Sequence, residues 1–229
     1  MPKYRYIAMA TASLMVLGAP ASAAYAASAH KSPKPVLTTG KKGGPAVKKG
    51  AVLKASLPKH TSVALAIGTF AATCTSSTIK AKVTANPSRP GKATLSVTGE
   101  SITKCSIGIA GVTLKSLTAV NLPYRGTVSA AKGDPVTIAE SKKSKPIGFK
   151  AVISVGATSA TCVFTAAKVS GHASNTGNKV TFKGQKFALD VSASSALCSE
   201  AGASTATFSA TYGPLRDTSA KHSPKVFVS

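Results

Sequence analysis

Apolar and polar residues alternate with a period of two along most of the chain after residue 61. In "TIKAKVTA", residues 78–85, Ile79, Ala81 and Val83 fall on one side and the lysines fall on the other. A two-residue period places apolar side chains on one face of a pleated strand and polar ones in water. The same pattern recurs in "KATLSVTG", "GVTLKSLTAV", "DPVTIAE", "FKAVISVG", "NKVTFKG", "KFALDVSA" and "STATFSATY".

Turn-forming residues separate these segments at short intervals. Many short strands with frequent turns are typical of an antiparallel β-sandwich or a barrel-like body. The segment "SATCVFTAAKVSG", residues 159–171, has the length of a short helix, but its β-branched residues favour a strand. We therefore predict an all-β domain over residues 61–229. Turns are predicted at Asn86-Pro87, Arg89-Pro90-Gly91, residues 132–135 and residues 174–178.

A short motif occurs twice, as "GTFAATC" at residues 68–74 and as "GATSATC" at residues 156–162. One interpretation is a duplicated pair of β units, with halves at residues 62–130 and 148–218. These halves would form two lobes, or two sheets that share one core. The alternative is chance similarity, because alanine and threonine are common in this chain.

The N-terminus predicts a secretory signal peptide at residues 1–23. Lys3 and Arg5 precede an apolar run from residue 7 to residue 19, which is shorter than the roughly 20 residues of a membrane-spanning helix. We expect the mature protein to be secreted, with no integral membrane segment and with possible association with the cell envelope. The small-residue pattern places cleavage after Ala23, Ala26 or Ala29.

Four cysteines follow the signal peptide. An exported chain with an even number of cysteines usually forms disulfides. Similar spacings favour the pairs Cys74–Cys105 and Cys162–Cys198, each of which would staple one half. No CxxC pair is present and no histidine lies near a cysteine, so we predict no metal site.

Residues 24–60 are rich in lysine, proline and glycine and contain no acidic residue. Such a segment buries little apolar surface and repels itself, so we predict a flexible, disordered basic tail. The alternative is that residues 50–57 add an edge strand to the domain. The lysines in this tail that we select as candidates for binding polyanions are Lys41, Lys42, Lys48 and Lys49.

Carboxylates and histidines are too sparse to define a catalytic site. Glu100, Asp134 and Asp217 stand beside turn residues, where solvated or turn-bonding roles are usual, and Asp190 alternates with apolar residues as a solvent-facing strand carboxylate would. His172 lies near a strand end, and we interpret it as a histidine with local hydrogen bonds. No GxSxG elbow and no phosphate-binding loop is present, so we expect no catalysis and no cofactor.

The charge of the chain is its main functional signal. Lysine and arginine total 29 against 6 acidic residues, for a formal net charge of +23 at pH 7. Such a field attracts polyanions. Lysines number 25 and arginines 4, and lysine lacks the planar fork that reads bases, so we expect no sequence-specific nucleic-acid binding. We predict a non-catalytic protein that associates electrostatically with anionic cell-wall polymers or other extracellular polyanions.

Two other function classes stay open. One is an extracellular hydrolase with a site near His172, which requires a serine and a carboxylate to converge on this histidine in space. The other is a module that binds a small ligand or inhibits a protein, which exposed phenylalanines would favour. The phenylalanines concerned are Phe149, Phe164, Phe182 and Phe187.

Much of the chain after residue 70 resembles a group of uncharacterised secreted proteins of actinobacteria. The resemblance implies export and an all-β body, and it assigns no activity and no functional residue. It rests on "AKVTANPSRPGKATLSV", "LTAVNLPY", "KVSGHASNTGNKVTFKGQKF", "FSATYGPLRDTS" and the closing "PKVFVS".

Overall fold

Nearly all regular structure in the chain is antiparallel strand, so the predicted all-β fold is confirmed. The computed structural model describes residues 33–142 and 145–229. The predicted signal peptide lies outside these residues. The elements are β1 Leu37–Thr39, β2 Val52–Ser56, β3 Val63–Ile67, β4 Phe70–Ala85, β5 Lys92–Ile107, β6 Val112–Val120, β7 Tyr124–Ser129, β8 Pro135–Ala139, β9 Ile147–Val155, β10 Thr158–Ala166, β11 Lys168–Ser174, β12 Lys179–Leu189, the short 3-10 helix η1 Val191–Ala193, α1 Ala196–Glu200, β13 Thr205–Tyr212, β14 Arg216–Asp217 and β15 Val226–Val228.

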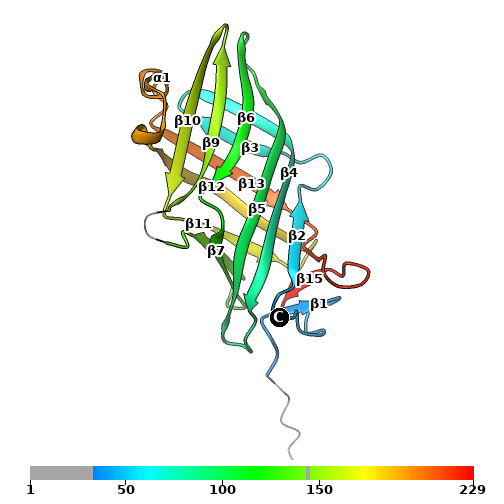
Figure 1. The fold of residues 1–229 in the computed structure, drawn as a ribbon. Helices are drawn as coiled ribbons and strands as arrows, with labels where there is room; N and C mark the ends of the chain where they lie inside the picture. Colours follow the sequence, from blue (N-terminus) through cyan, green and yellow to red (C-terminus); the bar gives the residue numbers. More distant parts are fainter. Residues whose placement is uncertain (1–32, 143–144) are drawn as a thin grey trace, which may run out of the picture. The chain divides into compact units, whose positions relative to one another are not determined.

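Eight strands close into a barrel (Figure 1). Their order is β5–β7–β8–β11–β12–β13–β3–β4, and β4 pairs again with β5 to complete the ring. Closure leaves these strands without free edges, which is one way in which β proteins avoid edge-to-edge aggregation. Of the two architectures that the sequence left open, the body is the barrel.

The barrel wall branches at the two strands β5 and β12. On one side of β5, the first part of the strand, up to Val97, pairs with β7, and a later part pairs with β6 at Ser101. In the same way, β12 pairs with β11 up to Phe182 and with β10 at Ala188 and Leu189. Two arcs of strands therefore connect β5 to β12 on this side, β7–β8–β11 and β6–β9–β10.

The core is mainly aliphatic, with a phenylalanine cluster at its centre. Phe149 lies 5.5 Å from Phe164 and 5.1 Å from Phe187 between ring centroids. All three rings are buried, as is Phe182. None of these four phenylalanines is exposed, so they do not favour a surface cleft that binds a ligand.

The prediction of a flexible tail is wrong for residues 33–60, because this segment packs into the body. β1 pairs with β15, and β2 pairs with β4 and β14. Leu37 and Leu53 are 1% and 2% exposed. The side chain of Asn86 also holds the segment, because its Nδ2 donates to the carbonyl oxygens of Leu37 and Val47 at 2.8 and 2.9 Å. Residues 24–32 of the predicted tail lie outside the described residues.

The repeated motif is a hairpin that the chain builds twice. Gly68 and Gly156 each open a two-residue turn with positive φ, of 54° and 57°. Each returning strand then carries a buried cysteine, Cys74 on β4 and Cys162 on β10. A type I′ or II′ turn requires this backbone, which explains the shared glycine.

Both predicted disulfides are present, Cys74–Cys105 and Cys162–Cys198. The first joins neighbouring strands, and the second joins β10 to α1. The two halves are nevertheless not separate lobes, because residues 33–229 form one unit and strands of both halves close a single barrel, with β3, β4, β5 and β7 of the first half adjacent to one another and β11, β12 and β13 of the second half adjacent to one another. The likeness between the halves is confined to the hairpin and its cysteine.

Candidate functional site

Three basic side chains stand in register across the outer face of β14, β2 and β4. Arg216 is directly opposite Lys54, and Lys54 is directly opposite Lys80. All three are exposed. We call this row the basic ladder. The residues beside Lys54, Leu53 and Ala55, are buried, so the alternation of β2 forces the lysine outward.

The basic ladder is expected to destabilise the folded protein. Like charges directly opposite each other on neighbouring strands repel. Arg216 is followed by Asp217, but that carboxylate is buried and accepts hydrogen bonds from the backbone and hydroxyl of Ser219 at 3.0 and 2.6 Å. The acidic side chain nearest in sequence therefore points to the other face of β14. The Arg216 guanidinium donates one hydrogen bond to the carbonyl oxygen of Ser223 at 2.9 Å, and no carboxylate among the described residues pairs with the ladder, so its charge is open to solvent or to an anionic partner.

The predicted polyanion-binding lysines lie on the connection between β1 and β2 and are exposed. This connection is structured, since the Gly44 amide donates to the Lys41 carbonyl at 2.9 Å and the Gly43 amide donates to Ser229 Oγ at 3.1 Å. Val47 anchors it at 2% exposure. The connection leads directly into β2, which carries the middle residue of the basic ladder. The lysines concerned are Lys41, Lys42, Lys48 and Lys49.

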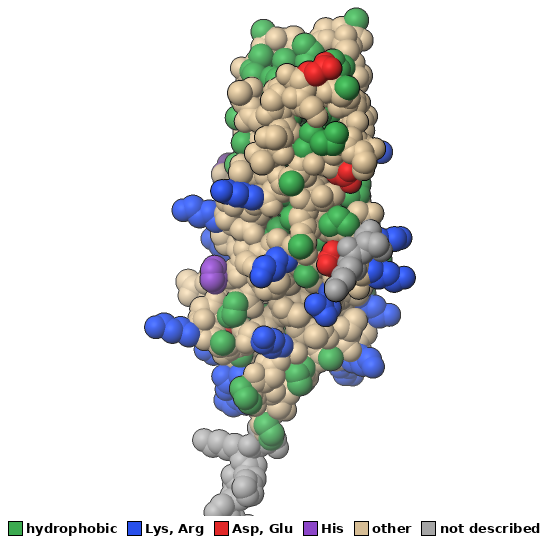
Figure 2. Space-filling model, turned by 90° about the vertical axis from the view of Figure 1, so that its left-hand side faces the viewer, with side chains coloured by type: hydrophobic (Ala, Val, Ile, Leu, Met, Phe, Trp, Pro, Cys, Tyr) green, Lys and Arg blue, Asp and Glu red, His purple; other side chains and the backbone are tan. Residues whose placement is uncertain are grey.

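Basic residues are distributed unevenly over the body. Several stretches contain no lysine or arginine; we consider four of them, and two of the six acidic residues, Asp190 and Glu200, lie within one of these four. In the view of Figure 2, lysine and arginine side chains cover the lower part and are missing from the top, where Figure 1 places the tip of the β9–β10 hairpin. The stretches are residues 60–79, 105–114, 151–167 and 187–215.

Sequence reasoning missed the basic ladder because it assigned Lys54 to a tail and gave no partners to Lys80 and Arg216. The available signal was the alternation in "AVLKASL", residues 51–57, which has the strand pattern found elsewhere in the chain. Strand pairing could not be read from it. Register across β14, β2 and β4 depends on residues that are far apart in sequence.

Glu100 points into the barrel, which corrects its predicted position beside a turn. β5 contains a bulge here, since Lys80 pairs with Gly99 while Ala81 pairs with Val97. The extra residue shifts the alternation of inward and outward side chains by one position. The side chain of Glu100 therefore points to the inner face, as that of Val97 does. Ile102, two residues further on, is 8% exposed and confirms the change of side.

The carboxyl of Glu100 lies in an apolar environment. It accepts a hydrogen bond of 3.4 Å from the Tyr212 hydroxyl, which also lies 2.9 Å from the hydroxyl of Ser77. Burial raises the pKa of Glu100 from 4.5 to about 7, and the hydrogen bond from Tyr212 partly offsets this rise. Desolvation disfavours the charged form of a carboxyl, which is the physical cause of the shift.

Asp217 and Asp190 lie in different environments. Asp217 is 4% exposed and accepts hydrogen bonds from Ser219, which is the turn-bonding role rather than the solvated one of the two that the sequence left open. Asp190 does not continue a strand, because β12 ends at Leu189 and the Asp190 side chain caps the 3-10 helix by accepting from the Ala193 amide at 3.3 Å. Asp134 lies in a turn, as predicted, and desolvation raises its pKa while Lys42 acts to lower it.

His172 is exposed on β11, and its Nδ1 lies 3.2 Å from the carbonyl oxygen of Gly133. Gly133 lies 39 residues earlier in the chain and His172 lies on a strand, so the structure does not show the loop histidine with local hydrogen bonds that the sequence suggested. The structure shows no hydrogen bond that joins it to a serine or a carboxylate among the described residues, so the hydrolase alternative gains no support from it.

Across residues 33–142 and 145–229, histidine, cysteine and acidic side chains nowhere gather in a group of three that could hold a metal ion. The same part of the chain has no helix with the length and apolar character that a membrane span requires. Comparison with protein families, curated protein sequences and solved structures finds no match to this chain.

Proposed function

We propose that this protein is a secreted, non-catalytic barrel that binds extracellular polyanions through the basic ladder and the neighbouring lysines of the β1–β2 connection. Anionic polymers of the cell envelope are the proposed partners. The observation that carries the proposal is the direct register of Arg216, Lys54 and Lys80, which costs stability without a compensating carboxylate. A repeating anion laid across the three strands would relieve this repulsion.

Two further observations support the proposal. The oxidised cysteines are consistent with a protein of an oxidising, extracellular environment. On the face that Figure 2 shows, basic side chains cover the lower part and are missing from the top, so an anionic polymer would be attracted to the lower part of this face. Lysine, a hydrated point charge, suits a polymer that is recognised by charge rather than by shape.

The test compares two triple variants with the same change in net charge. The ladder variant replaces Lys54, Lys80 and Arg216 by glutamine. The control variant replaces three other exposed lysines, whose strand positions place no cation directly opposite them, by glutamine. We expect the ladder variant to elute from heparin or from an anionic cell-wall fraction at clearly lower salt than the wild type. The control positions are Lys150, Lys168 and Lys183.

The control variant should elute close to the wild type, because its substitutions leave the ladder intact. Equal shifts for the two variants would show that net charge alone governs retention, and would refute a defined binding face. Retention that does not change with ionic strength would refute the electrostatic mechanism itself.

A further inference from the structure

The barrel encloses two adjoining cavities near Glu100. Their volumes are about 80 and about 50 Å³. They lie against each other, because five residues line both. The smaller cavity is bordered by Glu100 on one side and lies where the β7–β8–β11 and β6–β9–β10 arcs part, as its lining residues Tyr124 and Gly148 show. The shared residues are Ile79, Val97, Ile138, Phe182 and Tyr212.

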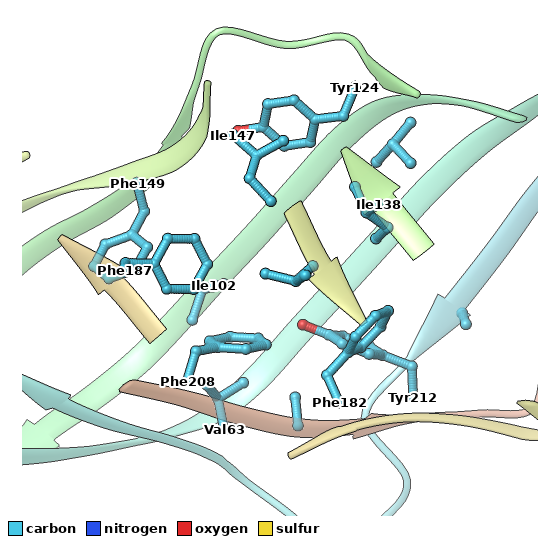
Figure 3. Packing of buried hydrophobic residues seen from close by; sticks show 14 of the residues in the cluster. Val63, Ile102, Tyr124, Ile138, Ile147, Phe149, Phe182, Phe187, Phe208 and Tyr212 are labelled. Atoms are coloured by element: carbon cyan, nitrogen blue, oxygen red, sulfur yellow. The ribbon is translucent and has the colours of Figure 1, made fainter. Parts of the chain in front are cut away.

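Aromatic side chains are concentrated around the smaller cavity. The described part of the chain contains nine aromatic residues, and six of them line this one cavity. Figure 3 shows them directed into the barrel interior from strands on different sides. These side chains belong to the hydrophobic core, and they also give the cavity beside Glu100 an aromatic lining. The six residues are Tyr124, Phe149, Phe182, Phe187, Phe208 and Tyr212.

The larger cavity has a different character. Its lining is mainly aliphatic, with Leu53 of β2, Leu95 of β5 and Val128 of β7, but Asn175, Asn178 and Lys179 also border it, and the buried Oδ1 of Asn178 has no hydrogen-bond partner among the described residues. The two cavities, which share five lining residues, therefore make up an interior region with an acidic, aromatic end and a mainly apolar end. We call this the inner chamber.

Glu100 has unused capacity to accept hydrogen bonds. A carboxylate offers about four acceptor positions, and the Tyr212 hydroxyl occupies one of them at the long distance of 3.4 Å. Part of the surface of Glu100 remains accessible although protein surrounds it, because that surface borders the cavity. A ligand in the smaller cavity would therefore meet the carboxyl directly.

We propose that the inner chamber binds a small primary alkylamine, with its ammonium group on Glu100 and its alkyl chain in the aliphatic cavity. An ammonium group supplies up to three donors to a carboxylate, and aromatic rings attract cations. A carboxylate ligand is disfavoured, because it would place a second negative charge beside Glu100. An alcohol would satisfy one acceptor position but would gain neither the ionic nor the cation–π attraction.

The size of the chamber limits the ligand to a few carbon atoms. In another protein, an apolar cavity of about 150 Å³ holds benzene. The two cavities, of about 80 and about 50 Å³, therefore suit a chain of about four carbons more than a fatty tail. The probe that matches this size is n-butylamine.

The experiment titrates the whole protein with n-butylamine and, as an uncharged control of equal length, with n-butanol. We expect butylamine to raise the unfolding temperature in a saturable way and butanol to do so at much higher concentration. The formal net charge of +23 works against nonspecific adsorption of amines to the surface. Nuclear Overhauser contacts from the butyl group to methyl groups of Leu53 and Val128 would place it in the chamber.

Two variants test the two ends of the chamber. Glu100→Gln should weaken butylamine binding at least about tenfold and leave butanol binding unchanged, because it removes the charge of the acceptor. Ala81→Leu should fill part of the larger cavity, whose wall includes Ala81, and should weaken butylamine more than methylamine. The second variant keeps the test decisive if the first does not fold.

Three results would overturn the proposal. They are no saturable effect of butylamine on the wild type, equal binding of butylamine and butanol, and butylamine contacts that map to the outer surface. A chamber that holds water and no amine would correspond to the first result. None of these results bears on retention by polyanions, so failure here leaves the proposed function to be judged by its own test.

Discussion

At the scale of single residues, the buried carboxyl of Glu100 is the least expected feature of this protein. Its inward position results from one extra residue in β5, which reverses the alternation between Val97 and Glu100. The titratable groups that face it are Tyr124 and Tyr212. Burial raises the pKa of Tyr124 to about 12, so its hydroxyl stays a hydrogen-bond donor over the whole physiological range.

Glu100 should make the stability of the protein depend on pH. Its pKa is 4.5 in the unfolded chain and about 7 in the folded barrel, so the folded state holds the proton more tightly between these values. The free energy of unfolding should therefore fall as pH rises from about 4.5 to about 7, by up to about 3 kcal/mol, and remain low above that.

Glu100→Gln should remove this dependence and stabilise the protein at pH 8, with little effect at pH 4. Urea unfolding of both proteins at several pH values measures the difference. As a companion variant, Tyr212→Phe removes the hydrogen bond that lowers the pKa of Glu100 and should move the transition to higher pH. Parallel stability curves for wild type and Glu100→Gln would contradict the assignment of a buried carboxyl.

At the scale of elements, much of the fold could be predicted from the sequence because alternation and turn chemistry are local. The strands and the turns follow from patterns that each span a few residues, whereas the similar spacings of the cysteines, 31 and 36 residues, predict the disulfide pairs. The integration of residues 33–60 could not be predicted in this way. It depends on distant partners, such as β15 for β1 and the Asn86 side chain for Leu37.

The candidate site was predictable only in outline. The lysines of the β1–β2 connection could be selected by charge, whereas the basic ladder requires the register of three strands. The inner chamber was hidden for a similar reason. A bulge interrupts the alternation of apolar and polar residues, so the sequence pattern does not reveal it. The sequence therefore predicts that Glu100 stands beside a turn residue, Gly99, and not inside a barrel.

The N-terminal segment should contribute to folding rather than act as a tether. Leu53→Ala removes a side chain that is 2% exposed on β2 and should lower the free energy of unfolding by about 2–5 kcal/mol. The neighbouring Val52→Ala is the matched control, because Val52 is 36% exposed and points away from the core. Thermal or urea unfolding distinguishes them. Equal, small effects of both substitutions would restore the flexible-tail interpretation.

At the scale of the whole molecule, charge and closure divide the protein into regions with different chemistry. Several stretches of the chain lack basic residues, and the remainder presents many more lysines than carboxylates. A closed barrel with two disulfides keeps these side chains in fixed positions on a rigid surface. The outer face of β14, β2 and β4 thus serves the proposed polyanion contact, and the interior serves the proposed amine site.

The most direct measurement of the central claim is amide chemical-shift mapping of the protein during titration with a long-chain polyphosphate at low salt. We predict perturbations on β14, β2, the outer positions of β4 and the β1–β2 connection, which disappear as salt is added. Perturbations centred on the stretches without basic residues, such as residues 151–167, or spread evenly over all lysines, would contradict a defined polyanion-binding face.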